Sequence, residues 1–136
     1  MNTKKILLIE DDNFINQLYM RILKQAGYEV VIAADGETGV KLADDSYNLV
    51  LLDIMLPKMD GINVLKKLKE NPDTKQIPVI LLTNLGQGNI INIAFTIGAQ
   101  GYLMKMSMSP YELVEKIKPF IVDPSFQMDI KEVNLE

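Results

Sequence analysis

Short apolar runs alternate five times with segments of helical periodicity along this chain. The apolar runs have the length of buried strands and cover residues 6–9, 28–33, 49–53, 79–82 and 102–104. This alternation predicts a parallel sheet covered by helices on both faces, because each right-handed crossover returns a helix to the sheet. We therefore expect an α/β fold, a doubly wound, flavodoxin-like (βα)5 domain with five parallel strands in the order 2-1-3-4-5.

The helices between these strands have recognisable periodicity, starts and ends. The first is expected over residues 13–26, and the fourth over residues 90–97. The inner face of the first helix is predicted from a spacing of four and consists of Phe14, Leu18, Ile22 and Ala26. Start and stop signals for the other helices are Asp35, Asp60-Gly61 and Gly98.

The last helix has the strongest start signal in the chain. The stretch Ser109-Pro110-Tyr111-Glu112 combines a serine cap, proline at the first helical position and glutamate three residues after the cap. Pro119 is expected to kink or end this helix near residue 120. Because the pattern is weak beyond it, we predict one domain over residues 1–122 and a tail over residues 123–136, with the terminal Leu135-Glu136 as a candidate cloning remnant.

Composition limits the chemistry that this 136-residue chain can support. It contains no cysteine and no histidine, so thiolate metal sites and the commonest general base are excluded. Any metal must be held by oxygen ligands, which favours Mg²⁺ or Ca²⁺. The net charge of -4 argues against a nucleic-acid-binding surface. No apolar run resembles a signal peptide or approaches the about 20 residues of a membrane span, so we expect a cytoplasmic protein.

Polar side chains follow the apolar runs at the points where the strands should end. Glu10 and Asp11 follow the first run, and Asp53 ends the third. Thr83 and Lys105 follow the fourth and fifth runs. Since the carboxyl ends of parallel strands share one edge, and the first and third strands flank the switch point, we expect these side chains in one crevice. Asp53 is the candidate reactive residue.

Three carboxylates in one crevice repel one another unless a cation or protonation relieves the repulsion. A divalent metal therefore explains Glu10, Asp11 and Asp53 together, whereas helix capping does not. The neighbouring Asp12 is equally well explained as the cap of the first helix.

These residues lie within longer stretches that resemble the receiver domain of two-component response regulators, the CheY-like superfamily. The resemblance covers the chain from Lys4 to about Ile121. The matching stretches are LIEDD at 8–12, LLDIMLPKMDG at 51–61, VILLT at 79–83 and GAQGYLMK at 98–105. Four motifs in this order and at this spacing make the resemblance specific.

The resemblance implies a signalling domain rather than a conventional enzyme. Asp53 would accept a phosphoryl group from a sensor histidine kinase or a histidine phosphotransfer protein, with Mg²⁺ as cofactor. Mg²⁺ would be held by Asp11 and Asp53, by Glu10 through water, and by the backbone carbonyl of Met55. Self-phosphorylation and autodephosphorylation at Asp53 are expected.

The resemblance also implies roles for three residues at the ends of the last two strands. Lys105 would bind one phosphate oxygen and the hydroxyl of Thr83 another. Thr83 would then move inward, and Tyr102 would follow into the space that it leaves. These movements would switch a partner-binding face.

Two departures from the family pattern affect the site. Proline, held cis, usually follows the lysine, but here the residue is Met106. A cis bond before a non-proline residue costs about 3–4 kcal/mol, so we expect a trans bond and a shifted Lys105. Asn84 stands where a small residue usually follows the threonine, and we expect it to alter dephosphorylation.

The segment between Lys75 and Lys105 has no charged residue. Within it, the apolar side chains of residues 90–97 cover an arc of about 200°, wider than a one-sided helix needs. We expect part of this arc to be exposed, with Ile91, Phe95 and Tyr102 as candidates for a face that docks an effector or a second copy of the chain.

Two other functional classes are compatible with parts of the pattern. A Mg²⁺-dependent hydrolase of the haloacid dehalogenase type would use Asp53 as its nucleophile, but such enzymes have an aspartate two residues later, where this chain has Met55. An interaction module that had lost phosphorylation would not need the complete set of site residues found here.

Overall fold

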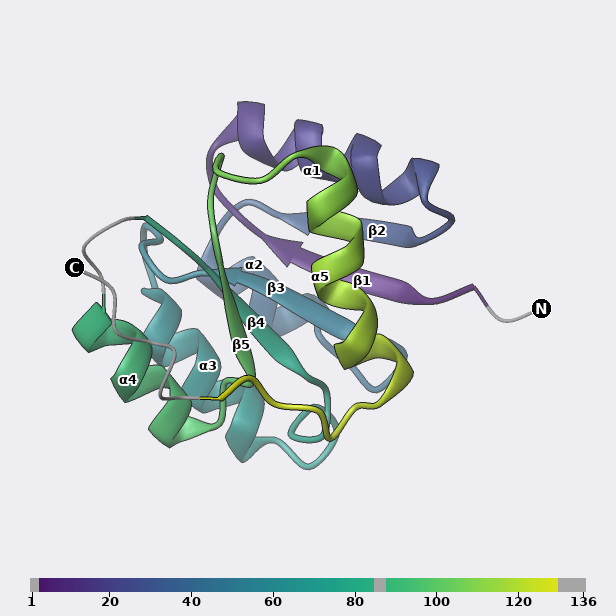
Figure 1. Ribbon diagram of the computed structural model, residues 1–136. Helices are drawn as coiled ribbons and strands as arrows, with labels where there is room; N and C mark the ends of the chain where they lie inside the picture. The colour runs from purple at the N-terminus through teal and green to yellow at the C-terminus, as the bar shows by residue number, and fades with distance from the viewer. Residues whose placement is uncertain (1–2, 85–87, 130–136) are drawn as a thin grey trace.

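In the computed structural model, which describes residues 3–84 and 88–129, a parallel sheet lies between two layers of helices (Figure 1). Its five strands are β1 (Lys5–Ile9), β2 (Glu29–Ala33), β3 (Leu49–Asp53), β4 (Val79–Thr83) and β5 (Gly101–Met104). The order β2-β1-β3-β4-β5 confirms the predicted topology. In the β1–β3 pair Ile9 is the partner of Leu52, so the residues after β1 emerge beside Asp53.

The described helices alternate with the strands as predicted. They are α1 (Asn13–Gln25), α2 (Gly36–Leu42), α3 (Gly61–Glu70), α4 (Gly88–Ile97) and α5 (Pro110–Val122). Asp35 and Asp60 cap α2 and α3 by accepting hydrogen bonds from Thr38 N and Asn63 N. Ser109 and Glu112 form the predicted capping box, and α5 continues through Pro119 to Val122.

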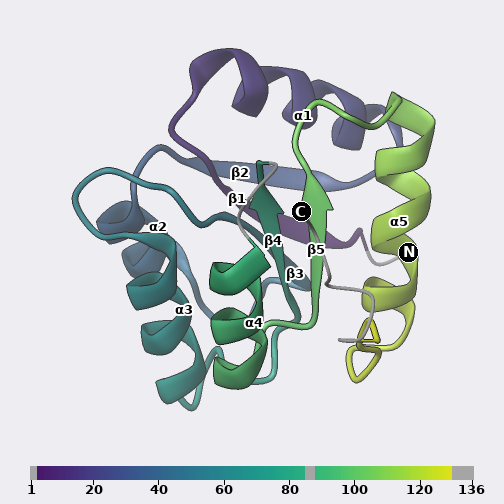
Figure 2. The same cartoon turned by 60° about the vertical axis from the view of Figure 1, so that its left-hand side comes forward.

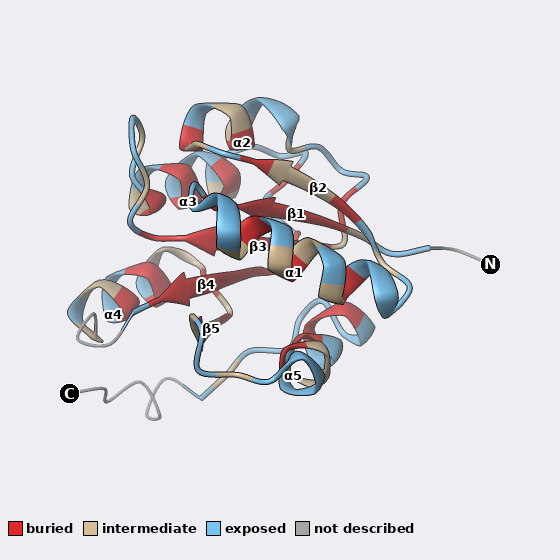
Figure 3. Ribbon diagram, turned by 90° about the horizontal axis from the view of Figure 1, so that it is seen from above, coloured by how far each residue is buried: buried red, intermediate tan, exposed pale blue. Residues whose placement is uncertain are grey.

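The two faces of the sheet bury separate hydrophobic clusters. Helices α2, α3 and α4 cover one face, and α1 and α5 cover the other (Figure 2). The central strands β1, β3 and β4 are buried almost throughout, whereas the helices alternate buried and exposed residues (Figure 3). This pattern is the one expected for a parallel sheet covered on both sides.

The inner face predicted for α1 is wrong in part. Phe14 is 67% exposed, and the buried side chains of this helix are Asn16, Tyr19 and Leu23. These buried residues are spaced three and four positions apart, but asparagine is polar and tyrosine is amphipathic. A prediction based on strongly apolar residues alone therefore selected the neighbouring face of the helix.

The exposure expected for Ile91 and Phe95 is also wrong. Both side chains lie in the cluster under α4, with exposed fractions of 0% and 6%. Their burial follows from the packing of α4 against α3 and from the core cluster that its side chains share with the sheet. Ile93 is the apolar residue of α4 that remains exposed, at 53%. Tyr102, the third candidate for the docking face, is half-buried.

The chain after α5 folds back along β5. Met128 N donates a hydrogen bond to Gln100 O (2.9 Å), and the Gln100 side chain donates to Pro124 O and Phe126 O. The Phe126 ring packs edge-on against Phe120, with 4.9 Å between the centroids. Leu135-Glu136, the candidate cloning remnant, lies outside the described residues. Among the described helices, none is long and apolar enough to cross a membrane.

Candidate phosphorylation site

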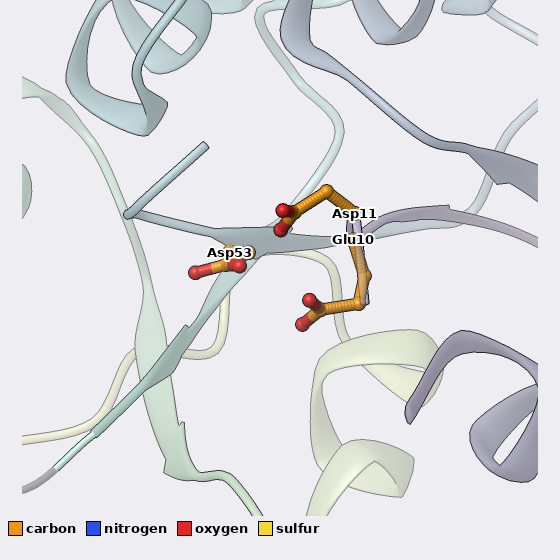
Figure 4. A group of neighbouring side chains, drawn as sticks. All are labelled: Glu10, Asp11 and Asp53. Atoms are coloured by element: carbon orange, nitrogen blue, oxygen red, sulfur yellow. The ribbon is translucent and has the colours of Figure 1, made fainter. Parts of the chain in front are cut away.

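Three carboxylates meet at the carboxyl edge of the sheet. Glu10 and Asp11 follow β1, Asp53 ends β3, and one oxygen of each lies within 4.8 Å of the others. Figure 4 shows Glu10 and Asp11 extending toward Asp53. Glu10 and Asp53 are buried and Asp11 is exposed, so the cluster opens to solvent on the Asp11 side. The structure brings these predicted residues together.

Both oxygens of Asp53 have hydrogen-bond donors. Met55 N donates to Oδ1 (2.9 Å), and the ammonium of Lys105 donates to Oδ2 (3.0 Å). The start of α3 lies close to the backbone of Asp53 and Ile54 because Gly61, its first residue, has no side chain. A Cβ there would lie 2.7 Å from Asp53 O and 2.4 Å from Ile54 Cα.

Lys105 also contacts Glu10, at 3.1 Å from Nζ to Oε1. Burial acts to lower the pKa of Lys105, but the hydrogen bond and charge of Asp53, together with Glu10, outweigh it and raise the pKa. The same desolvation raises the pKa of Glu10 to about 7, and the charge of Asp53 adds to the effect. Asp12 N and Lys105 oppose this shift without cancelling it. One ammonium thus faces more negative charge than it can neutralise.

Asp12 is the cap of α1 and accepts a hydrogen bond from Ile15 N (3.0 Å). This is one of the two interpretations that its sequence position left open. Its side chain is not a member of the carboxylate cluster found among the described residues.

Thr83 lies at the same edge, at the end of β4, and is fully buried. Its hydroxyl donates toward Leu103 O (3.5 Å) and Met104 Sδ (3.3 Å), both in β5. The hydroxyl is therefore directed to the neighbouring strand, and a turn about its side-chain bond is needed to redirect it to a group on Asp53.

The peptide bond before Met106 is trans, as predicted, because the described residues contain no cis peptide bond. Met106 has a φ of 62°, in the left-handed region. The ammonium of Lys105 still reaches Asp53 and Glu10.

Two buried polar residues near the site were not predicted from the sequence. Asn16 donates from its side chain to Glu10 O (3.0 Å), and its Oδ1 has no partner among the described residues. The Tyr19 hydroxyl accepts a hydrogen bond from Met106 N (3.3 Å). The spacing of residues 16, 19 and 23 was the available signal, and it was hidden by the polarity of asparagine.

Comparisons with known proteins agree with this geometry. The family model described as the response regulator receiver domain matches residues 6–118. The chain belongs to this family. Its members are receiver domains of two-component signalling systems rather than conventional enzymes.

Among curated relatives, the transcriptional regulatory protein CpxR of Escherichia coli K12 is 40% identical over 117 residues, which are 86% of this chain and 49% of CpxR. The transcriptional regulatory protein SrrA of Staphylococcus aureus is 36% identical over 120 residues, which are 88% of this chain and 48% of SrrA. The receiver domain thus spans about half the length of the curated relatives that it matches.

Solved structures share the fold. A CheY-like receiver domain protein from Methanospirillum hungatei JF-1 has a TM-score of 0.82 and 32% identity, over 90% of this chain and 96% of that one. The receiver domain of the sensor histidine kinase PA1611 from Pseudomonas aeruginosa PAO1 has a TM-score of 0.79 and 28% identity, over 90% and 100% of the two chains. That structure has a magnesium ion coordinated in its active-site cleft.

Proposed function

We propose that Asp53 accepts a phosphoryl group from a phosphohistidine on a sensor histidine kinase or a histidine phosphotransfer protein in the cytoplasm. The observation that supports this most directly is the Asp53 carboxylate, which ends a buried strand between the Lys105 ammonium and two further carboxylates. An oxygen of Asp53 would form the new P–O bond while the P–N bond to the imidazole breaks. The electron pair of that bond stays on the imidazole nitrogen.

The donor set fits a hard divalent cation. Carboxylate oxygens within 4.8 Å of one another are the ligands that Mg²⁺ prefers. The pKa of Glu10 is raised by burial first and then by the charge of Asp53, and a bound cation would relieve the charge repulsion between these carboxylates. Asp11 and Asp53 would hold the ion directly, Glu10 through water, and the Met55 carbonyl would supply a further oxygen. Bound Mg²⁺ would supply charge neutralisation for the transferred group.

Lys105 and Thr83 would respond to the new phosphoryl group. Lys105 already contacts Asp53 and would bind a phosphoryl oxygen, because the added negative charge strengthens its hydrogen bonds. The Thr83 hydroxyl would turn from Met104 and Leu103 toward another phosphoryl oxygen. Tyr102 on β5 would then move. This movement would change the affinity of the α4–β5 surface for an effector or for a second copy of the chain.

Incubation with acetyl phosphate and Mg²⁺, followed by intact mass spectrometry, tests the proposal. We expect the wild-type protein to gain the mass of one phosphoryl group, and to lose it slowly by autodephosphorylation. EDTA and Asp53→Asn should each prevent the gain. Asp44→Asn, at an exposed carboxylate in the α2–β3 connection, is the matched control and should behave as wild type.

Two outcomes contradict the proposal. Phosphorylation that persists in Asp53→Asn would assign the acceptor to another residue. A wild-type protein that releases phosphate rapidly without accumulating the phosphorylated mass would favour the hydrolase alternative.

A further inference from the structure

The loop between β5 and α5 has a backbone conformation that needs support. Met106 has a φ of 62°, and its side chain is 55% exposed. A non-glycine residue in the left-handed region costs of the order of 1–2 kcal/mol, and it persists where neighbouring contacts compensate. The exposed side chain of Met106 is a weak source of such contacts, so the support must reach its backbone.

The hydroxyl of Tyr19 supplies this support. Tyr19 projects from the inner face of α1, is 4% exposed, and accepts a hydrogen bond from Met106 N at 3.3 Å. The loop after β5 passes beside α1 in both views of the fold (Figures 1 and 2). Proline at position 106 could neither donate this bond nor adopt this φ, because its ring removes the N–H and fixes φ near -65°. The contact therefore requires a residue other than proline at this position.

The supported peptide is the one that follows Lys105. On its other side, Lys105 N donates to Thr83 O at 2.8 Å. The backbone of Lys105 is thus fixed on both sides: its own N–H bonds to β4, and the N–H of the next residue bonds to Tyr19. Its ammonium reaches both Glu10 and Asp53 from this position.

The Tyr19 hydroxyl also senses the charges of the site. Burial raises the pKa of Tyr19, the Met106 N–H opposes this, and the charges of Glu10 and Lys105 act in opposite directions on it. The charges of Glu10 and Lys105 therefore act on the hydroxyl that accepts the Met106 N–H.

We propose that Tyr19 is a positioning residue for phosphoryl transfer: its buried hydroxyl holds the Met106 N–H and thereby fixes the peptide that carries Lys105. This inference rests on the proposed function of Asp53. Tyr19 itself touches no reacting atom. It replaces, by a hydrogen bond between elements, the rigidity that proline supplies at this place in the family pattern.

Tyr19→Phe keeps the ring and removes only the hydroxyl. We expect the first-order rate constant of phosphorylation at saturating acetyl phosphate to fall about three- to tenfold, which is the effect of losing one hydrogen bond that holds the ammonium in place. The dissociation constant for Mg²⁺ should stay within about twofold, because the carboxylates do not move. Tyr47→Phe, a buried tyrosine before the opposite end of β3, is the matched control and should leave the rate unchanged.

Substitutions at position 106 separate positioning from general packing. Met106→Gly keeps the N–H and accepts a positive φ, so Tyr19→Phe should cause the same loss in that background. Met106→Pro removes the N–H, so Tyr19→Phe should cause no further change there. An equal loss in the proline background would mean that the hydroxyl acts through packing and would overturn the proposal.

The hydrogen bond can also be measured in the wild-type protein, without any variant. We expect the Met106 amide to exchange slowly with D₂O although the residue is exposed. Exchange at the rate of an unprotected loop would overturn the proposal. A wild-type protein that gains no phosphoryl group would overturn the function proposed for Asp53 and this role with it, whereas equal rates for wild type and Tyr19→Phe would overturn the role of Tyr19 alone.

Discussion

At Glu10, burial opposes the charge of the carboxylate. Its pKa is raised from 4.5 to about 7, first by burial and then by the charge of Asp53, so the folded protein favours the protonated form. A raised pKa contributes stability that is fully present below about pH 4.5 and is lost as the pH rises through about 7. Without a metal, alkaline solutions therefore leave Glu10 ionised in a buried site where one ammonium faces two carboxylates.

Glu10→Gln should remove this loss. In EDTA, we expect the variant to be more stable than wild type by about 1–3 kcal/mol at pH 8, with a smaller difference at pH 5.5. Urea denaturation at the two pH values measures the difference. The exposed Glu70→Gln serves as control. A stability difference that is the same at both pH values would show that Glu10 is not the titrating group.

Asn84, which stands where the family pattern has a small residue, should affect the loss of the phosphoryl group. The residue follows Thr83 and is exposed. A side chain of this size beside the phosphoryl group should change the access of an attacking water, so the lifetime of phosphorylated Asp53 should differ between wild type and Asn84→Ala. Intact mass measured over time after removal of acetyl phosphate gives both lifetimes. Equal lifetimes would show that Asn84 does not affect dephosphorylation.

At the scale of elements, α4 divides its apolar residues between the core and the surface. Ile91 is fully buried and Ile93 is 53% exposed, because residues two positions apart lie on roughly opposite sides of a helix. Ile91→Asp should destabilise the domain by about 3 kcal/mol or more, since it buries a charge, whereas Ile93→Asp should change stability by less than about 0.5 kcal/mol. Urea denaturation distinguishes the two.

The variant Ile93→Asp also tests the proposed docking face. If α4 and β5 bind a second copy of the chain after phosphorylation, Ile93→Asp should weaken the association while leaving the fold intact. Sedimentation of the phosphorylated proteins measures it. Association unaffected by Ile93→Asp would place the interface elsewhere.

The segment after α5 stabilises the edge strand β5. Met128 bonds to Gln100 through its N–H, and its Sδ accepts from Tyr102 N at 3.3 Å. Ending the chain after Asp123 should therefore lower the free energy of unfolding by about 1–3 kcal/mol. Ending it after Asp129 keeps every one of these contacts and is the control. Equal stability of the two truncated chains would contradict the prediction.

At the scale of the whole molecule, periodicity was sufficient to predict the sheet order and the position of the site. The strands are apolar and are separated by helices with clear caps, and the polar residues that end them meet at the carboxyl edge of a doubly wound sheet. Exposure within a helix was harder to predict. The burial of Phe95 and the exposure of Phe14 depend on which neighbouring helix packs against each side, and the sequence of one helix does not contain that information.

Contacts between residues that are far apart in the sequence could not be predicted from its pattern either. The bond from Met106 to Tyr19 joins residues 87 positions apart, and it depends on a backbone conformation that no propensity favours for methionine. The family pattern indicated only that the loop between β5 and α5 must differ in conformation, because Met106 replaces the usual proline. The structure is needed to identify the side chain that compensates.

Binding of Mg²⁺ should stabilise the whole fold, because the carboxylates that hold it come from separate parts of the chain and meet only in the folded state. A ligand that binds the folded state alone adds RT ln(1 + [L]/Kd), or about 2.7 kcal/mol at 100 times Kd. We expect 10-fold increments of Mg²⁺ above Kd to raise the Tm of the wild-type protein in equal steps at pH 8. Asp11→Asn, which alters the exposed ligand without disturbing the buried Lys105 pair, should reduce this response at least severalfold. K⁺ at equal ionic strength is the control for screening, and an equal response to both ions would mean that the three carboxylates do not form a divalent cation site.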